Sequence, residues 1–217
     1  MYFPSRTEAG RQLALKLAGY RYENAIVVAL SDGAVLVGQE IAATLHCGLA
    51  MLMTDEIDVP GENQTFGTVD HTGGFAYNSE ISQDQSDEYY SEYHGVIEQQ
   101  KMEKFHKLNL LLTDGGLVDK EMIRHHVVVL VSDGFKDGRL LDAAAEFLKP
   151  IPLEKLVIAA PVASVAAVDK MHIMADEIQC LSVTDNYLDT DHYYDINVVP
   201  EHAQVVAAIN QNVLNWR

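Results

Sequence analysis

The sequence predicts an α/β fold, a mostly parallel central sheet with helices on both faces and a β-hairpin flap. Short, continuous apolar runs at residues 25–30, 127–131 and 156–160 are typical of strands that are buried on both faces of a parallel sheet. Stretches with apolar residues at helical spacing lie between these runs, and Ser-Asp-Gly turns follow two of them. Strands that alternate with helices in this way form βαβ units with right-handed crossovers.

The N-terminal half is expected to contain two helices, two strands of that sheet and the flap. We expect its first elements in this order: helix 8–18, strand 25–30, helix 35–45 and strand 49–53. Residues 58–78 break the pattern, because Pro60-Gly61 and Gly73-Gly74 separate short segments of alternating polarity. Such segments, at 65–69 and 75–77, predict a β-hairpin.

The C-terminal half continues the alternation of strands and helices. We expect helix 86–111, strand 127–131, helix 138–148, strand 156–160, helix 165–174, strand 177–181 and helix 200–216. No segment rich in Pro, Gly or Ser divides the chain. We therefore expect one domain over residues 1–217, with an inserted flap at about 58–115.

The charge balance limits the partners of the protein. Fifteen Lys and Arg stand against 32 Asp and Glu, a formal net charge of −17. A surface of this sign repels nucleic acid and anionic membranes, so neither is expected as a partner. No apolar run approaches the roughly 20 residues that span a bilayer, and the first residues lack a secretory signal. We therefore expect a cytoplasmic protein that binds no membrane.

The residues after each predicted strand are the candidate site, because open α/β sheets bind ligands at the carboxyl ends of their strands. Ser31-Asp32-Gly33 and Ser132-Asp133-Gly134 follow two of the strands. In one interpretation their backbone N–H groups face a ligand at helix N-termini. In the other, the polar residues cap helices and the glycines relieve turns. The second segment continues as Phe-Lys-Asp-Gly-Arg, which is neither a P-loop nor a dinucleotide fingerprint.

Several segments, taken in order over about residues 1–200, resemble the type I phosphoribosyltransferase family. They are 26–37, 57–61, 66–69 with Asn78, 128–144, 157–162, 175–181 and 192–195. The resemblance implies that residues 132–139 stand where the family holds the ribose 5-phosphate of phosphoribosyl pyrophosphate (PRPP). It implies this role for Ser132, Asp133, Gly134, Lys136, Asp137, Gly138 and Arg139. It also places Ser31, Asp32 and Gly33 at the pyrophosphate loop, and Asp55, Glu56, Pro60 and Gly61 at the flap.

The departures from the family pattern fall on charged positions. Of the two acidic residues that hold the ribose hydroxyls in the family, only Asp133 remains, and both threonines that wrap the phosphate are absent. Asp32 stands where the family has Arg, and Asp55-Glu56 stand where it has Arg-Lys. A unit-charge contact at about 4 Å is worth roughly 4 kcal/mol at an effective dielectric of about 20. We therefore expect that PRPP-dependent catalysis is lost, with no catalytic residue assigned, and that the protein acts in binding, regulation or assembly.

Two other functions remain open. The first is an active phosphoribosyltransferase in which Asp133 holds the ribose hydroxyls, Lys136 and Arg139 hold the phosphate, and Mg²⁺ offsets the acidic residues. The second is a cation-dependent enzyme of other chemistry, with a small-molecule ligand in an acidic pocket. Carboxylate oxygens suit hard divalent cations, so Asp32, Asp55 and Asp133 are the candidate metal ligands. The alternative is a solvated acidic rim that binds nothing.

Two further features bear on packing or assembly. The C-terminal helix has apolar residues at helical spacing: Val205, Val206, Ile209, Val213 and Leu214. They fit either the core or a dimer contact, and we expect a homo-oligomer. Tyr89, Tyr90 and Tyr93 lie in an acidic stretch. They either cover a ligand or an interface, or pack beneath a loop.

Overall fold

The structure, a computed structural model, describes residues 2–111 and 115–212. The chain divides into two compact units. The first comprises Met1–Leu52, Asp114–Asp137 and Ile151–Arg217, and the second comprises Met53–Thr113 and Gly138–Pro150. Among the described residues, no helix is long and apolar enough to cross a membrane.

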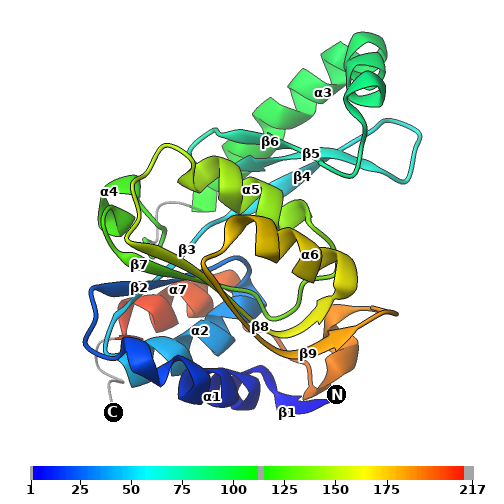
Figure 1. Ribbon diagram of the computed structural model, residues 1–217. Helices are drawn as coiled ribbons and strands as arrows, with labels where there is room; N and C mark the ends of the chain where they lie inside the picture. Colours follow the sequence, from blue (N-terminus) through cyan, green and yellow to red (C-terminus); the bar gives the residue numbers. More distant parts are fainter. Residues whose placement is uncertain (1, 112–114, 213–217) are drawn as a thin grey trace. The chain divides into compact units, whose positions relative to one another are not determined.

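The first unit is built on a five-stranded sheet with the order β3-β2-β7-β8-β9. Its strands are β2 (Ala25–Ala29), β3 (Gly48–Met51), β7 (Val127–Val131), β8 (Lys155–Ser164) and β9 (Glu177–Thr184). Every neighbouring pair is parallel, as Figure 1 shows. All residues of β2 and β7 are buried, which agrees with their continuous apolar runs. The predicted α/β class is confirmed.

Helices cover both faces of this sheet. They are α1 (Arg6–Leu17), α2 (Asp32–Leu45), α4 (Lys120–Ile123), α6 (Val165–Met174) and α7 (His202–Asn210). In Figure 1, α1, α2 and α7 lie on one face and α6 on the other. Helix α1 begins two residues before the predicted start because Ser5 caps it, its side chain accepting a hydrogen bond from the Glu8 backbone N–H.

The C-terminal helix contributes to the core of the first unit. Val205, Val206 and Ile209 on α7 are buried. Val213 and Leu214, which the sequence placed on the same helix, lie outside the described residues. The predicted homo-oligomer stays a prediction.

A short parallel pair joins the first strand of the chain to a strand that precedes α7. Strand β1 (Phe3–Ser5) pairs with β10 (Tyr194–Ile196), with Phe3 opposite Tyr194. Three-residue strands are too short to show a hydrophobic period, so no sequence pattern indicates this pair. It matters for the site, because it brings the start of α1 next to the C-terminal segment.

The second unit has an antiparallel sheet and two helices. Its elements are β4 (Thr54–Asp58), β5 (Thr65–Asp70), β6 (Phe75–Tyr77), α3 (Gln83–Leu111) and α5 (Arg139–Leu148). The predicted hairpin is present as β5 and β6, and β4 adds a third strand on the other side of β5. Asp55 and Glu56 therefore lie within a strand and not in the loop after one.

The three tyrosines of α3 belong to the packing of the second unit. Tyr89, Tyr90 and Tyr93 are partly buried against a core cluster. That cluster consists of Ile57, Val59, Phe66, Val69, Ile97 and Leu108. Their packing supports the structural interpretation of this aromatic group.

A partly exposed ion pair links β8 and β9 and makes stability depend on pH. Lys155 Nζ lies 2.7 Å from Glu177 Oε2, and the Tyr20 hydroxyl donates to the same carboxylate. The hydrogen bond from Lys155 is the main cause that lowers the pKa of Glu177 to about 2. A carboxylate with a depressed pKa stabilises the fold above its ordinary pKa of 4.5, and this contribution disappears as the pH falls toward 2.

Glu177→Gln is therefore expected to lower the free energy of unfolding at pH 7 by about 0.2–1 kcal/mol, the range for exposed pairs. The difference from the unmodified protein should shrink as urea unfolding is repeated at lower pH, toward pH 2. Glu154→Gln, a change at an exposed residue beside the same pair, is the control. A difference that is equal at both ends of the pH range would contradict this account.

Candidate functional site at the ends of two neighbouring strands

The two Ser-Asp-Gly segments meet in the first unit. They follow β2 and β7, which pair in parallel with Ala29 opposite Val131. The strand ends therefore lie at the same edge of the sheet, as expected for this candidate site. The Ser31 hydroxyl donates a hydrogen bond of 2.8 Å to Asp133 Oδ1.

Arg6, from the first turn of α1, pairs with Asp133. Its Nε lies 2.7 Å from Asp133 Oδ2, and its side chain is 3% exposed. The guanidinium also pairs with Asp191 and donates to the backbone oxygen of Asn197 at 3.0 Å. It lies 4.6 Å from the centre of the Tyr194 ring. We call this group the Arg6 network: Arg6, Ser31, Asp133, Asp191 and Tyr194.

Burial and charge within the network shift the pKa values of its members. Burial lowers the pKa of Arg6, but the hydrogen bond to Asp191 and the charge of Asp133 outweigh it, so the net shift is upward. Burial, with the nearby charge of Asp133, raises the pKa of Tyr194, whose hydroxyl donates to the Asp133 backbone oxygen. At neutral pH the guanidinium therefore stays charged and the phenol stays protonated.

Gly33 leaves room for this ion pair. A Cβ atom at Gly33 would lie 2.2 Å from Asp133 Oδ2 and 2.8 Å from Arg6 Nε. Gly33 is helical, in the first turn of α2, and it does not have a positive φ. Its role is thus to let a helix approach a buried charge pair closely, and not to relieve a turn as the second interpretation of the sequence held.

The loop after β7 is buried over its first part. Ser132 and Phe135 are each 1% exposed, and Asp133 is 7% exposed. The Phe135 N–H donates to Val162 O at 3.0 Å, and its carbonyl accepts from Ser164 N at 2.8 Å. These bonds fix the loop against β8 by its backbone.

The aromatic C-terminal segment covers the same loop. A Cβ atom at Gly134 would lie 2.1 Å from the Tyr187 hydroxyl and 3.0 Å from the Thr190 Cγ2. Tyr187 OH and Thr190 Oγ1 are themselves joined at 2.8 Å, and burial raises the pKa of Tyr187 to about 12. Gly134 therefore provides space for this covering segment.

Helix capping accounts for one of the two serines. The Ser31 side chain accepts a hydrogen bond from Ala34 N at 3.0 Å, so Ser31 caps α2 as the structural interpretation predicted. The helix after Ser132 begins beyond it, with Gly138 as the N-cap of α5, and the Ser132 hydroxyl bonds to the Gly134 backbone within its own turn. Asp32 lies in the first turn of α2, with Oδ1 3.0 Å from His202 Nδ1.

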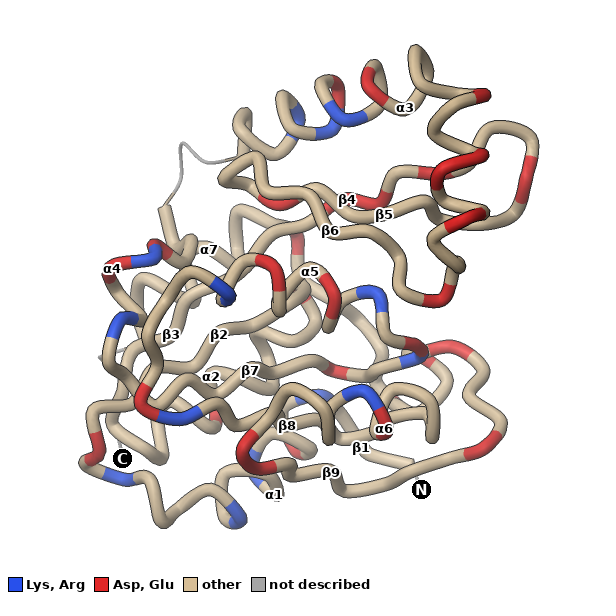
Figure 2. Tube along the Cα trace, turned by 45° about the horizontal axis from the view of Figure 1, so that its top comes forward, with Lys and Arg blue, Asp and Glu red and all other residues tan. Residues whose placement is uncertain are grey.

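The other predicted site residues lie in the second unit. Asp55 and Glu56 of β4 have basic partners there: Lys107 Nζ lies 2.9 Å from Asp55, and Arg139 Nη1 lies 2.9 Å from Glu56. Figure 2 shows the acidic residues of β4 and the basic residues of α3 within this unit. Arg139 also donates to the Thr65 hydroxyl at 2.8 Å.

Residues 132–139 do not form one continuous loop within a single unit. Residues 132–137 belong to the first unit, whereas Gly138, the N-cap of α5, and Arg139, its first residue, belong to the second. Lys136 is exposed. Pro60 and Gly61 lie in the turn between β4 and β5, where Gly61 has a φ of 77°.

The candidate metal ligands do not fit a divalent cation at Asp133. One carboxylate oxygen of Asp133 accepts from Arg6 and the other from Ser31. A guanidinium 2.7 Å away already neutralises this charge and would repel a cation. Across the described residues, no group of three or more His, Cys, Asp or Glu side chains is placed to hold a metal ion. Asp32 and Asp55 belong to different units.

Sequence reasoning missed Arg6, Asp191 and Tyr187, and found Tyr194 only within the resembling segment 192–195. The pair between Arg6 and Asp133 joins residues 127 positions apart, and no local pattern encodes such a contact. One signal was available. Most of the Asp and Glu residues after the predicted strands have no Lys or Arg beside them in the sequence. A buried carboxylate among them therefore needs a cationic partner from a distant segment.

Comparisons with known proteins place this chain near the phosphoribosyltransferases. No family model matches the sequence. Proteins from two strains of Mycobacterium tuberculosis, whose names give them provisionally as phosphoribosyl transferases, are 27% identical over 186 residues, 83% of this chain. The match covers 40% of each of those proteins, so this chain spans less than half the length of the curated relatives it matches.

A solved structure agrees with the fold. The protein TT1426 from Thermus thermophilus is 25% identical with a TM-score of 0.74, and the match covers 100% of this chain and 99% of that one. A purine phosphoribosyltransferase from Pyrococcus horikoshii is 13% identical over 83% of each chain, with a TM-score of 0.46. The sequence resemblance to phosphoribosyltransferases is confirmed.

Proposed function

We propose that this protein is a phosphoribosyltransferase-like binding protein that does not transfer a phosphoribosyl group from PRPP. The observation that carries the proposal is that the Asp133 carboxylate is already bonded within the protein. By resemblance, Asp133 is the one retained residue that would hold the ribose hydroxyls. In this chain both of its carboxylate oxygens are bound within the Arg6 network, and it is 7% exposed.

The basic residues that remain near the loop give further support. Lys136 and Arg139 are the two cations that the resemblance offers to a phosphate. Arg139 is paired with Glu56 at 2.9 Å. A ligand would have to break this pair before Arg139 could bind a phosphate, and Glu56 would then repel that phosphate. Exposed Lys136 alone is a weak substitute for a phosphate-binding loop.

The test is calorimetry of the purified chain with PRPP and Mg²⁺. We expect no heat beyond dilution, which corresponds to a Kd above about 1 mM. The control is Asp133→Asn, which keeps one side-chain oxygen at this position and should leave the absence of binding unchanged. Micromolar binding of PRPP would overturn the proposal, and release of pyrophosphate on addition of a nucleobase would identify an active phosphoribosyltransferase instead.

A further inference from the structure

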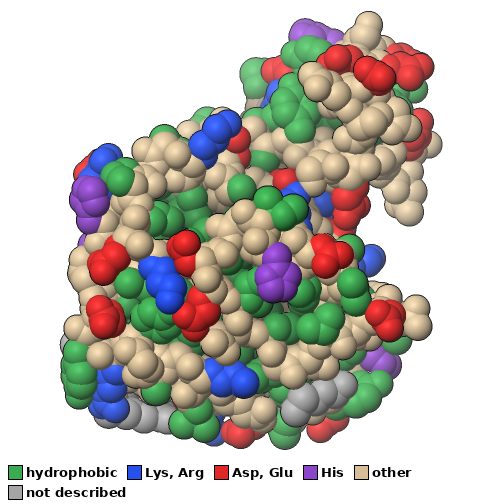
Figure 3. Space-filling model, in the orientation of Figure 1, with side chains coloured by type: hydrophobic (Ala, Val, Ile, Leu, Met, Phe, Trp, Pro, Cys, Tyr) green, Lys and Arg blue, Asp and Glu red, His purple; other side chains and the backbone are tan. Residues whose placement is uncertain are grey.

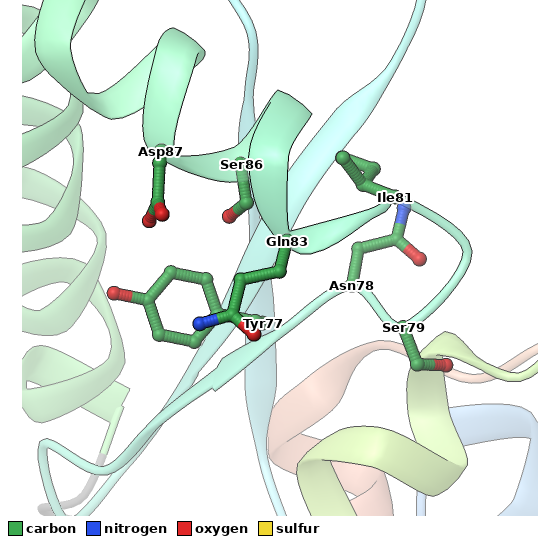
Figure 4. Close-up of a pocket in the computed structure, with 7 residues that line it drawn as sticks. All are labelled: Tyr77, Asn78, Ser79, Ile81, Gln83, Ser86 and Asp87. Atoms are coloured by element: carbon green, nitrogen blue, oxygen red, sulfur yellow. The ribbon is translucent and has the colours of Figure 1, made fainter.

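A cavity of about 370 Å³ lies in the second unit, between the end of β6 and the start of α3. Figure 4 shows the seven residues that line it: Tyr77, Asn78, Ser79, Ile81, Gln83, Ser86 and Asp87. All of them belong to the second unit. Its volume falls within the range of about 300–1,000 Å³ that is typical of small-molecule sites.

Two of the lining side chains form hydrogen bonds with other residues of the unit. Asn78 Nδ2 donates to the backbone oxygen of Thr65 at 2.8 Å, and Asn78 is buried. The Ser79 hydroxyl donates to Asp142 at 3.0 Å. Both side chains are thus engaged within the unit, and ligand recognition is left to the other lining side chains.

The remaining polar groups converge beside one aromatic ring. Asp87, Ser86 and Gln83 come from the first turns of α3, and Figure 4 shows their polar ends on the side of the Tyr77 ring. Tyr77 is 55% exposed although its ring packs edge-on against Phe75. Of the charged residues, only Asp87 is part of the lining. An aromatic face with a carboxylate beside it is suited to a positively charged ligand.

The sequence around the lining residues is negatively charged, as Asp87 is. Within the second unit, residues 53–100 contain 11 Asp and Glu and no Lys or Arg. The first basic residue after them, Lys101, pairs with Glu98 at 2.9 Å and lies 4.0 Å from the centre of the Phe75 ring. On the face shown in Figure 3, acidic side chains gather over the start of α3. A concave site within such a surface concentrates cations.

We propose that this cavity binds a small organic cation with primary ammonium or guanidinium groups. Asp87 neutralises the positive charge, the face of Tyr77 packs against the cation, and Gln83 and Ser86 accept hydrogen bonds from its N–H groups. The positive end of the α3 dipole, roughly half a charge, opposes binding. Asp84 and Asp87, near the start of α3, outweigh it with two full negative charges. The lining residues belong to the second unit and the Arg6 network to the first, and the proposal does not depend on whether the protein binds PRPP.

The probe is 1,4-diaminobutane, tested by calorimetry at low ionic strength. We expect one molecule to bind per chain, and we expect no binding of 1,4-butanediol or succinate, its neutral and anionic counterparts. Equal binding of the diol would overturn the proposal in favour of a polyol site. The absence of binding by the diamine would also overturn it, and neither result would bear on PRPP.

Matched variants separate a defined site from general charge attraction. Asp87→Asn should weaken binding of the diamine at least tenfold. Glu88→Gln removes the same charge from the next exposed residue, which does not line the cavity, and should change the affinity less than twofold. Tyr77→Phe should keep the affinity, whereas Tyr77→Leu should reduce it. Equal losses in Asp87→Asn and Glu88→Gln would overturn the proposal, provided that both variants keep the unmodified melting temperature.

Discussion

Replacement of Arg6 by methionine is expected to lower the free energy of unfolding by about 3–5 kcal/mol, measured by urea denaturation at neutral pH. The methionine removes the partner of Asp133, whose side chain is 10% exposed, and leaves a carboxylate with little access to water. An unpaired charge in such surroundings costs far more than the loss of an exposed pair. Arg6→Met also removes the contact with the Tyr194 ring, 4.6 Å from the guanidinium carbon.

The control for this prediction is Arg11→Met on the same helix. Arg11 is half exposed and pairs with Glu8 and Glu40 at 3.3 and 3.2 Å. Exposed pairs contribute about 0–1 kcal/mol, so this variant should unfold at nearly the same urea concentration as the unmodified protein. Similar losses for Arg6→Met and Arg11→Met would show that the Arg6 network does not stabilise the fold.

A double variant tests the origin of the loss. Arg6→Met with Asp133→Asn leaves no buried carboxylate in the Arg6 network, and the asparagine can still accept the hydrogen bond from Ser31. We expect the double variant to be more stable than Arg6→Met alone, because the largest penalty is the unpaired charge. If Arg6→Met does not fold, Asp191→Asn gives a milder test, since Asp191 is half exposed and should cost less.

The sheet of the first unit was predictable because its strands are continuous apolar runs. The residues of β2 and β7 are buried on both faces, and their hydrophobicity therefore needs no alternation to be recognised. Strand β4 was missed for the opposite reason. Its sequence, Thr-Asp-Glu-Ile-Asp, has one apolar residue, and its acidic side chains are tolerated because basic residues of α3 and α5 pair with them. Strands whose polarity is balanced by tertiary ion pairs carry no hydrophobic signal.

The position of the candidate site was predictable from the sequence, but the role of its residues was not. Neighbouring parallel strands must bring Ser31 and Asp133 to one edge, and they do. The sequence led to the interpretation that the Asp133 carboxylate binds a ribose or a metal ion, because its partner, Arg6, lies far from it in the sequence. A short strand pair that has no sequence signature, β1 with β10, positions Arg6 beside Asp191. The interpretation of Asp133 therefore changed because of its contact with Arg6, which forms only when the distant segments of the chain have folded together.

Phe135→Ala is expected to lower the free energy of unfolding by about 3–5 kcal/mol. The Phe135 side chain is 1% exposed and is among the largest fully buried side chains. It lies within residues 132–139, where the resemblance implies a phosphate-binding loop. The backbone of Phe135 is bonded on both sides to β8, so the loop cannot collapse into the space that the ring leaves. A cavity that persists adds to the lost burial of the ring.

Ile173→Ala, at a residue of α6 that is 86% exposed, should change stability by no more than about 0.5 kcal/mol and serves as the control. Both variants are compared by urea denaturation with the unmodified chain. A loss below about 1 kcal/mol for Phe135→Ala would mean that the ring is not packed as part of the core. The loop would then be free to open around a phosphate, which would weaken the case for a protein without PRPP chemistry. A loss in the expected range instead makes the loop a part of the core, since a segment that stabilises the fold this strongly is held in its buried conformation.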